Sequence, residues 1–249
     1  MKRFRISIVT MVMMLCAFTG IGYAEELKTA GSGSVDVMSN YVWRGLKLSD
    51  SWVIQPSVGI TYGSFGANIW VNYDTDIDEV NETDITLSYS RSWDKFTFGA
   101  GYIYYALDGF DDTQEVYLSA AYDTILSPKL TLYYDFDEGD GAFIVASIGH
   151  TIDLSGMSKG AALSLGASAG FNIENSIMGV DANGEDFTNF YNGELSAALT
   201  IPVTDNFSIT PKLAYSFPLT DDAKDAIRAI SYDNDSSIFY GGINLTLSF

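Results

Sequence analysis

One arginine occupies a position at which its charge has chemical consequences. Arg44 lies in the stretch "SNYVWRGLKLSDS", between an apolar Tyr-Val-Trp and a second apolar run that begins at Trp52. A guanidinium in apolar surroundings needs a carboxylate partner, because an unpaired buried charge is costly. In a water-filled passage the same charge can instead belong to a ring that selects ions. The surroundings of Arg44 therefore decide its role.

Two other features of the sequence are candidates for a catalytic site and a metal site. His150 is the only histidine, and no plausible nucleophile accompanies it, so we expect no enzyme. In the run "DTDIDEVNETD" aspartates occupy positions 74, 76 and 78, the alternate spacing of a calcium-binding loop. That loop also needs glycine at its sixth position and glutamate at its twelfth, where this chain has Glu79 and Ile85. We expect no cofactor and no specific metal site.

The N-terminus has the pattern of an export signal. A basic start is followed by the apolar run "ISIVTMVMMLCAF" and by small residues before "EEL". This run is shorter than a spanning helix and typical of a secretory signal peptide. We expect cleavage after Ala24, so that residues 1–24 are removed and residues 25–249 form one exported domain without cysteine.

Composition excludes two classes of protein. The chain carries 32 acidic and 13 basic residues, a net charge of −19, so a phosphate backbone would repel it and we expect no nucleic-acid partner. An acidic disordered chain is excluded as well, because 47% of the residues are hydrophobic and 14% are aromatic.

Strict alternation of apolar and polar residues dominates the chain after position 24, as in "FGANIWVNYD" and "FYGGINLTLSF". Successive side chains of a strand point to opposite faces, so each such segment has one apolar and one polar face. We expect about twelve strands, of the length that crosses a membrane at a tilt. They span approximately 34–44, 52–62, 65–74, 83–91, 96–107, 114–122, 129–136, 141–150, 160–172, 190–201, 206–217 and 238–249.

Alternation alone fits either a soluble β-sandwich or a membrane barrel, and the connections decide between them. Every second connection is shorter than ten residues, whereas the others include the two long ones, 173–189 and 218–237, and hold most of the acidic residues. Short periplasmic turns and longer outer loops are typical of outer-membrane barrels. The predicted fold is therefore an all-β, transmembrane antiparallel β-barrel of about 12 strands with acidic extracellular loops.

Aromatic residues gather at the expected strand ends, as in the interfacial girdles of membrane barrels. This set comprises Tyr41, Trp43, Trp52, Tyr62, Phe65, Tyr73, Tyr89, Phe96, Tyr122, Phe207 and Phe217. The segment "DDAKDAIRAI", Asp221 to Ile230, has helical spacing in the last outer loop. It rests in the lumen mouth or is solvated, and we slightly favour the solvated position.

The alternation also predicts which charged side chains face the lumen. In the first expected strand the apolar face consists of Val35, Val37, Tyr41 and Trp43, which turns Arg44 inward near the outer mouth. A lipid-facing arginine would cost about 2–4 kcal/mol at the midplane. The candidate lumen and constriction residues are Arg44, Asp84, Glu115, Asp135 and Glu194 near the mouth and Lys212 deeper, with Asp36 near the periplasmic end. They form a structural network, an ion-selecting constriction, or both.

Residues Val35 to Asp74 resemble the opening of the TorF-type putative porins of proteobacteria, also known as the Gcw_chp family. The positions that carry the resemblance are Ser39, Asn40, Tyr41, Arg44, Gly45, Ser49, Gln55 and Pro56. The resemblance implies an outer-membrane barrel of uncertain physiological role and brings no catalytic residues.

The sequence thus predicts an integral protein of the outer membrane of a Gram-negative bacterium. We expect a porin-like channel for passive diffusion of small solutes or ions, with cations preferred because the loops and lumen are acidic. A non-conducting barrel for surface structure or contact is the alternative. Expected partners are outer-membrane lipid, lipopolysaccharide and small solutes or cations. The terminal Phe249 and the apolar residues before it resemble the signal that the barrel assembly machinery reads.

Overall fold

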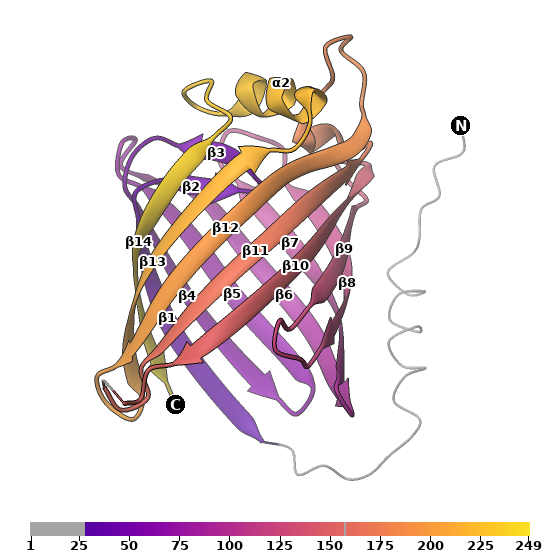
Figure 1. The fold of residues 1–249 in the computed structure, drawn as a ribbon. Helices are drawn as coiled ribbons and strands as arrows, with labels where there is room; N and C mark the ends of the chain where they lie inside the picture. The colour runs from indigo at the N-terminus through magenta and orange to yellow at the C-terminus, as the bar shows by residue number, and fades with distance from the viewer. Residues whose placement is uncertain (1–27, 157) are drawn as a thin grey trace.

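A computed structural model describes residues 28–156 and 158–249 of the chain, so the expected signal peptide lies outside the described residues. Twelve strands form one closed antiparallel barrel in the order β1-β14-β13-β12-β11-β10-β9-β8-β7-β6-β5-β4 (Figure 1). Their bounds are β1 Thr29–Met38, β4 Val53–Tyr62, β5 Phe65–Asp74, β6 Glu79–Trp93, β7 Phe96–Leu107, β8 Thr113–Tyr122, β9 Lys129–Asp135, β10 Gly141–Asp153, β11 Ala162–Ile173, β12 Thr188–Pro202, β13 Phe207–Pro218 and β14 Ile238–Ser248.

The first and last strands close the barrel, with β1 and β14 paired from Ser32 and Ser248 to Met38 and Gly242. Backbone hydrogen bonds between Gly31 and Phe249 extend this seam to the chain end. Closure leaves neither strand with an unpaired edge, which is the condition for exposing a sheet to lipid. Figure 1 shows the C-terminus at one end of the barrel and helix α2, Asp221–Ile230, at the other. We refer to these as the periplasmic and outer ends.

The predicted fold class is confirmed, and eleven of the twelve expected strands lie within a few residues of their observed positions. The first strand is the exception. We expected residues 34–44, but β1 ends at Met38, and the chain then leaves the wall. Residues 41–49 form a separate two-stranded sheet of β2, Tyr41–Trp43, and β3, Leu46–Ser49.

The turn between β2 and β3 explains this departure. Arg44 and Gly45 both have positive φ angles, 48° and 86°. Two successive residues with positive φ are typical of the tight turn that matches the twist of a hairpin. A Cβ on Gly45 would lie 2.8 Å from Cβ of Asn192, so only glycine fits this position.

The barrel wall has its apolar side outward, the reverse of a soluble sandwich. Side chains about half exposed include Val58, Ile60, Leu87, Leu118, Leu130, Leu195 and Leu213. Many of the buried wall positions are polar, among them Asn72, Glu115, Asp135, Asn172 and Ser216. A soluble fold would leave this apolar band in water, whereas lipid satisfies it. Among the described residues, no helix is both long and apolar enough to span a membrane.

The assignment of the exposed apolar side chains of the wall to the lipid can be tested by substitution. Leu118 lies in the middle of β8 and is 62% exposed. Leu118→Arg should lower the free energy of unfolding in lipid vesicles by about 2–4 kcal/mol, because a guanidinium would enter the hydrocarbon layer. Urea titration followed by tryptophan fluorescence measures this change.

The matched control is Ser119→Arg, one residue along the same strand on the lumenal face. It should cost far less, since its side chain can reach water inside the barrel. Equal losses for the two variants would contradict the assignment of the two faces.

Candidate functional site

The segment Tyr41–Ser49, which we name the inner hairpin, folds into the outer half of the lumen. Tyr41, Leu46, Lys47 and Ser49 are all buried, although none of them lies in the barrel wall. Tyr41 and Trp43 therefore do not belong to the aromatic girdle, and that expectation is wrong for both. The alternation turns both outward only if β1 continues past Met38, where the strand in fact ends.

Arg44 stands at the tip of the inner hairpin and reaches across to the wall at β8. Its Nη1 and Nη2 atoms each lie 2.7 Å from a carboxylate oxygen of Glu115, which gives a two-point ion pair. The two side chains are 8% and 1% exposed. Tyr105 donates a third hydrogen bond, of 2.8 Å, to Glu115. Paired in this way, two charges can remain in a site with little water.

Three aromatic rings enclose the guanidinium of Arg44. Its Cζ atom lies 4.4 Å from the ring centroid of Trp43, 4.5 Å from that of Tyr133 and 4.9 Å from that of Phe143. The negative faces of aromatic rings attract a cation at such distances. Arg44 thus faces the lumen as expected, but from the turn of an inserted hairpin rather than from a barrel strand.

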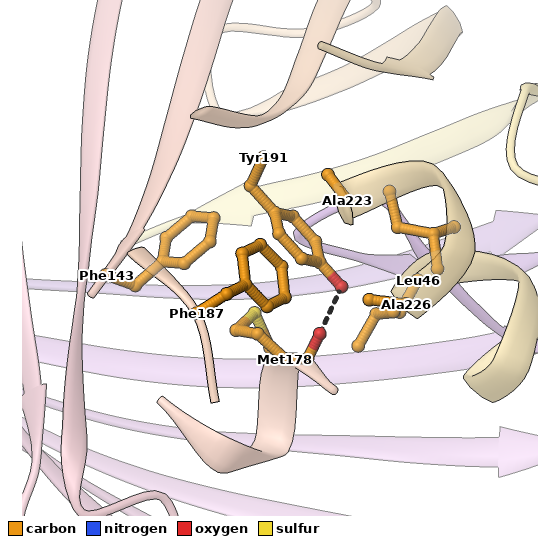
Figure 2. Packing of buried hydrophobic residues seen from close by; sticks show 8 residues of the cluster. Leu46, Phe143, Met178, Phe187, Tyr191, Ala223 and Ala226 are labelled. Carbon is orange, nitrogen blue, oxygen red and sulfur yellow. Dashed lines mark hydrogen bonds between the residues drawn. The ribbon is translucent and has the colours of Figure 1, made fainter. Parts of the chain in front are cut away.

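An apolar cluster, which we name the outer plug, lies between the inner hairpin and α2. It comprises Leu46, Phe143, Met178, Phe187, Tyr191, Ala223, Ala226 and Ile227. Figure 2 shows the rings of Phe143, Phe187 and Tyr191 grouped near Met178. Phe187 stacks on Tyr191, Phe143 meets Tyr191 edge-on, and the hydroxyl of Tyr191 donates to the carbonyl of Met178 at 2.8 Å. Met178 belongs to the short 3-10 helix η1, Ser176–Met178. The two long outer connections and the inner hairpin therefore share one core.

Helix α2 supplies the last part of the outer plug. Thr220 caps its first turn, and the buried residues Ala223, Ala226 and Ile227 repeat at helical spacing on one face. The helix was expected at the right residues, but the preference for a solvated position is wrong. Its buried face packs against β3 of the inner hairpin and against the outer ends of β12 and β13.

A polar latch ties the inner hairpin to the segment after α2. The Nζ atom of Lys47 lies 2.6 Å from Oδ2 of Asp233 and also contacts the carboxylate of Asp50. The backbone N–H of Tyr232 donates to the carbonyl of Lys47 at 2.9 Å, and that of Lys47 donates to the Ser231 hydroxyl at 3.1 Å. The inner hairpin and the segment after α2 are thus held together at the outer end of the barrel.

The periplasmic half of the lumen has a different lining. Cross-strand partners there are small, such as Gly66 with Ser88, Gly99 with Ser119 and Gly166 with Ser196. A Cβ on each of these glycines would meet the partner hydroxyl, so both residues of each pair share the inward face. This half, which we name the vestibule, has short polar walls, whereas the outer half is filled with aromatic and charged side chains.

The remaining candidate lumen residues lie on inward faces of the wall. Asp135 accepts from the Thr113 hydroxyl at 2.7 Å, and Glu194 accepts from the Tyr240 hydroxyl at 2.8 Å. Oδ1 of Asp84 is buried and, within the described part of the chain, has no hydrogen-bond partner. Of the six candidates, only Arg44 and Glu115 contact each other through these hydrogen bonds. Lys212 pairs instead with a residue outside that set.

That partner is Asp36, whose Oδ1 lies 2.7 Å from Nζ of Lys212. We placed Asp36 near the periplasmic end, but it lies two residues from the outer end of β1, because that strand begins and ends earlier than expected. Glu82 was missed altogether and accepts from the Tyr41 hydroxyl at 3.0 Å. The period-two pattern of Asp84 and Thr86 continues back to Glu82, so the signal was present in the sequence.

Arg44→Met should destabilise the barrel, because it leaves the buried carboxylate of Glu115 without its cation. The expected loss is about 3–5 kcal/mol of unfolding free energy. Arg44→Lys should cost less, since it keeps the charge but loses the two-point geometry. Urea unfolding in detergent micelles measures both.

The double variant Arg44→Met/Glu115→Leu removes both charges and should recover most of the loss. A single variant as stable as the natural sequence would show that the pair does not hold the hairpin.

The latch should weaken in acid. The ammonium of Lys47 donates to Asp233 and holds the pKa of that carboxyl below its ordinary value. A depressed folded-state pKa gives stability that is present above the ordinary aspartate value and lost as the pH falls through the lower one. The protection factor of the Tyr232 amide, the factor by which it exchanges more slowly than an unstructured peptide at the same pH, should therefore be high near neutral pH and lower below about pH 4. Asp233→Asn should exchange faster at neutral pH and lose this pH dependence; an unchanged profile would contradict the latch.

Comparison with known proteins agrees with this architecture. No family model and no curated protein sequence matches the chain. Among solved structures, the COG4313 outer membrane channel from Pseudomonas putida F1 is 11% identical, with 92% of this chain and 100% of that chain covered and a TM-score of 0.54. The NanC porin is 12% identical over 89% of this chain and 99% of that chain, with a TM-score of 0.49. With its apolar outer band, this chain has the fold of an integral outer-membrane barrel similar to channels.

Proposed function

We propose that this barrel is a passive channel for small solutes, that it prefers cations, and that the inner hairpin gates its outer mouth. The observation that carries the proposal is the division of the lumen. A vestibule with short polar walls leads from the periplasmic end to a charged and aromatic outer half, which a separate, inserted hairpin occupies. A permanently closed barrel without a transport role would have no need of a polar vestibule.

The preference for cations follows from the charges that face the lumen. Glu115 and Asp36 are neutralised by Arg44 and Lys212. The carboxyl groups of Glu82, Asp84, Asp135 and Glu194 add to this set, and the hydrogen bonds to three of them come from hydroxyl or backbone N–H groups. Rings of acidic side chains favour cations in channels. Twelve strands lie between filled small barrels and wide porins, so a narrow passage is expected.

Conduction requires movement of the inner hairpin. The inner hairpin and the outer plug occupy the outer half of the lumen, and Arg44 ties the hairpin to Glu115 of the wall. The strands of the hairpin pair with each other and not with barrel strands. Its links to the wall are side-chain contacts, such as Arg44–Glu115 and Tyr41–Glu82, so it can move without unpairing a barrel strand. The resemblance of residues 35–74 to the TorF-type putative porins supports a porin-like role for this segment.

The outer plug also favours a second candidate, a permanently closed barrel with a structural or contact role. Its buried aromatic cluster is the kind of packing that stabilises a fixed arrangement. An enzymatic role has less support. His150 lies at the periplasmic end, where its Nδ1 is 2.8 Å from the carbonyl oxygen of Ile125, far along the chain and the barrel from the acidic outer half.

Single-channel recording in planar bilayers separates the two candidates. Met38 and Val53 are direct cross-strand partners, so residues 39–52 can be replaced by a two-residue Asn-Gly turn. The shortened barrel should show stable conductance steps, and the natural sequence should show rare or smaller ones. In a potassium chloride gradient the reversal potential should indicate potassium over chloride.

The variant Glu82→Gln/Asp84→Asn in the shortened barrel should reduce this preference while steps remain. A shortened barrel that folds without conducting would support the closed, structural role. Chloride preference would contradict the charge argument.

A further inference from the structure

A cavity of about 260 Å³ lies inside the barrel beside the base of the inner hairpin. Its walls come from the hairpin and from inward positions of β1, β4, β5, β13 and β14. It is separate from the outer plug and from the Arg44–Glu115 pair, which lie against α2 and against β8 to β10. The channel proposal assigns it no role.

Three aromatic rings line this cavity: Tyr41, Trp70 and Tyr240. The centroids of Tyr41 and Trp70 are 5.5 Å apart, with their planes inclined by 50°. The hydroxyls of Tyr41 and Tyr240 donate to carboxylates, at 3.0 Å and 2.8 Å. These bonds fix the two tyrosines through their hydroxyls, so that the rings present carbon surface to an occupant of the cavity.

The charges in the cavity neutralise each other. Oδ1 of Asp36 lies 2.7 Å from Nζ of Lys212, and Oδ2 of Asp36 accepts from the Asn244 amide at 2.9 Å. An ammonium has three N–H donors, so this pairing leaves Lys212 with donors to spare, and its side chain is 37% exposed. Gln55 donates its amide to Asn72 at 2.9 Å, which leaves its carbonyl oxygen as an acceptor.

We propose that this cavity binds a neutral sugar ring. A sugar has an apolar face of C–H groups that fits an aromatic wall, and a rim of hydroxyls that both donate and accept hydrogen bonds. The cavity offers three aromatic rings, spare donors on Lys212 and an acceptor on Gln55, and the Asp36–Lys212 pair adds no net charge. A charged ligand would have to compete with that pair for its partners, whereas a neutral hydroxylated ring leaves it intact. The volume suits one monosaccharide.

The vestibule gives such a ligand a route to the cavity. One step toward the periplasmic end, the inward positions on the same strands are Ser34, Ser57, Asn68 and Thr210. All four are short and polar. The hairpin lies on the outer side of the cavity, so we place the route of a ligand on the periplasmic side.

Saturation-transfer difference NMR tests the proposal on the folded barrel in a detergent without a sugar headgroup, since such a headgroup would compete. D-glucose and D-galactose serve as probes, and sodium benzoate tests for an anionic aromatic ligand instead. We expect saturation transfer to the ring C–H protons of at least one sugar and none to benzoate. Trp70→Ala and Lys212→Met should each weaken binding about tenfold or more.

Trp93→Ala is the matched control, because Trp93 is 77% exposed on the wall near the periplasmic end. It should leave binding unchanged. Trp70→Phe keeps an aromatic face and should bind more tightly than Trp70→Ala, which separates loss of the site from loss of the fold. No transfer to either sugar, transfer to benzoate alone, or equal binding by Trp70→Ala would overturn the proposal. Binding needs no open pore, so it is tested independently of conduction.

Discussion

A buried guanidinium and the carboxylate that neutralises it organise the outer half of this barrel. Arg44 can lie in the lumen only because Glu115 meets both of its terminal nitrogens, at 2.7 Å, and because three rings replace the water it loses. This contact joins the tip of a hairpin to a strand 71 residues away. Once the tip is fixed, Leu46 faces α2 and completes the outer plug.

Lipid on the outside and a partly filled lumen on the inside impose opposite demands on one layer of protein. Every second residue must be apolar for the bilayer, and the residues between must be polar or small. The wall meets both demands with leucine and isoleucine outward and with asparagine, serine and glycine inward. The apolar core that a soluble protein would hold between its sheets is here reduced to the outer plug, and the loops and α2 build it.

The sequence sufficed to predict the wall, because apolar and polar residues alternate in every strand. This alternation identifies a strand even when its ends are placed a few residues away from the observed ones. It also predicted α2 and the inward direction of Arg44. It did not predict the hairpin, since residues 39–44 continue the alternation of β1. Only the Arg-Gly turn indicates that the chain leaves the barrel wall there. Some partners are remote in the chain, such as Glu115 for Arg44 or Asp36 for Lys212. Which of these residues meet depends on the register between barrel strands, and no local sequence pattern specifies that register. Glu82 was missed because β6 begins earlier than its apolar residues suggest.

The central claim is that Arg44 is held against Glu115 when the protein lies in a bilayer. Solid-state NMR can measure the dipolar coupling between guanidinium nitrogens and glutamate carboxyl carbons in protein labelled at both residue types. The account predicts a contact of about 4 Å or less that disappears in Glu115→Gln. A spectrum without such a contact in the natural sequence, or one unchanged by that substitution, would contradict it.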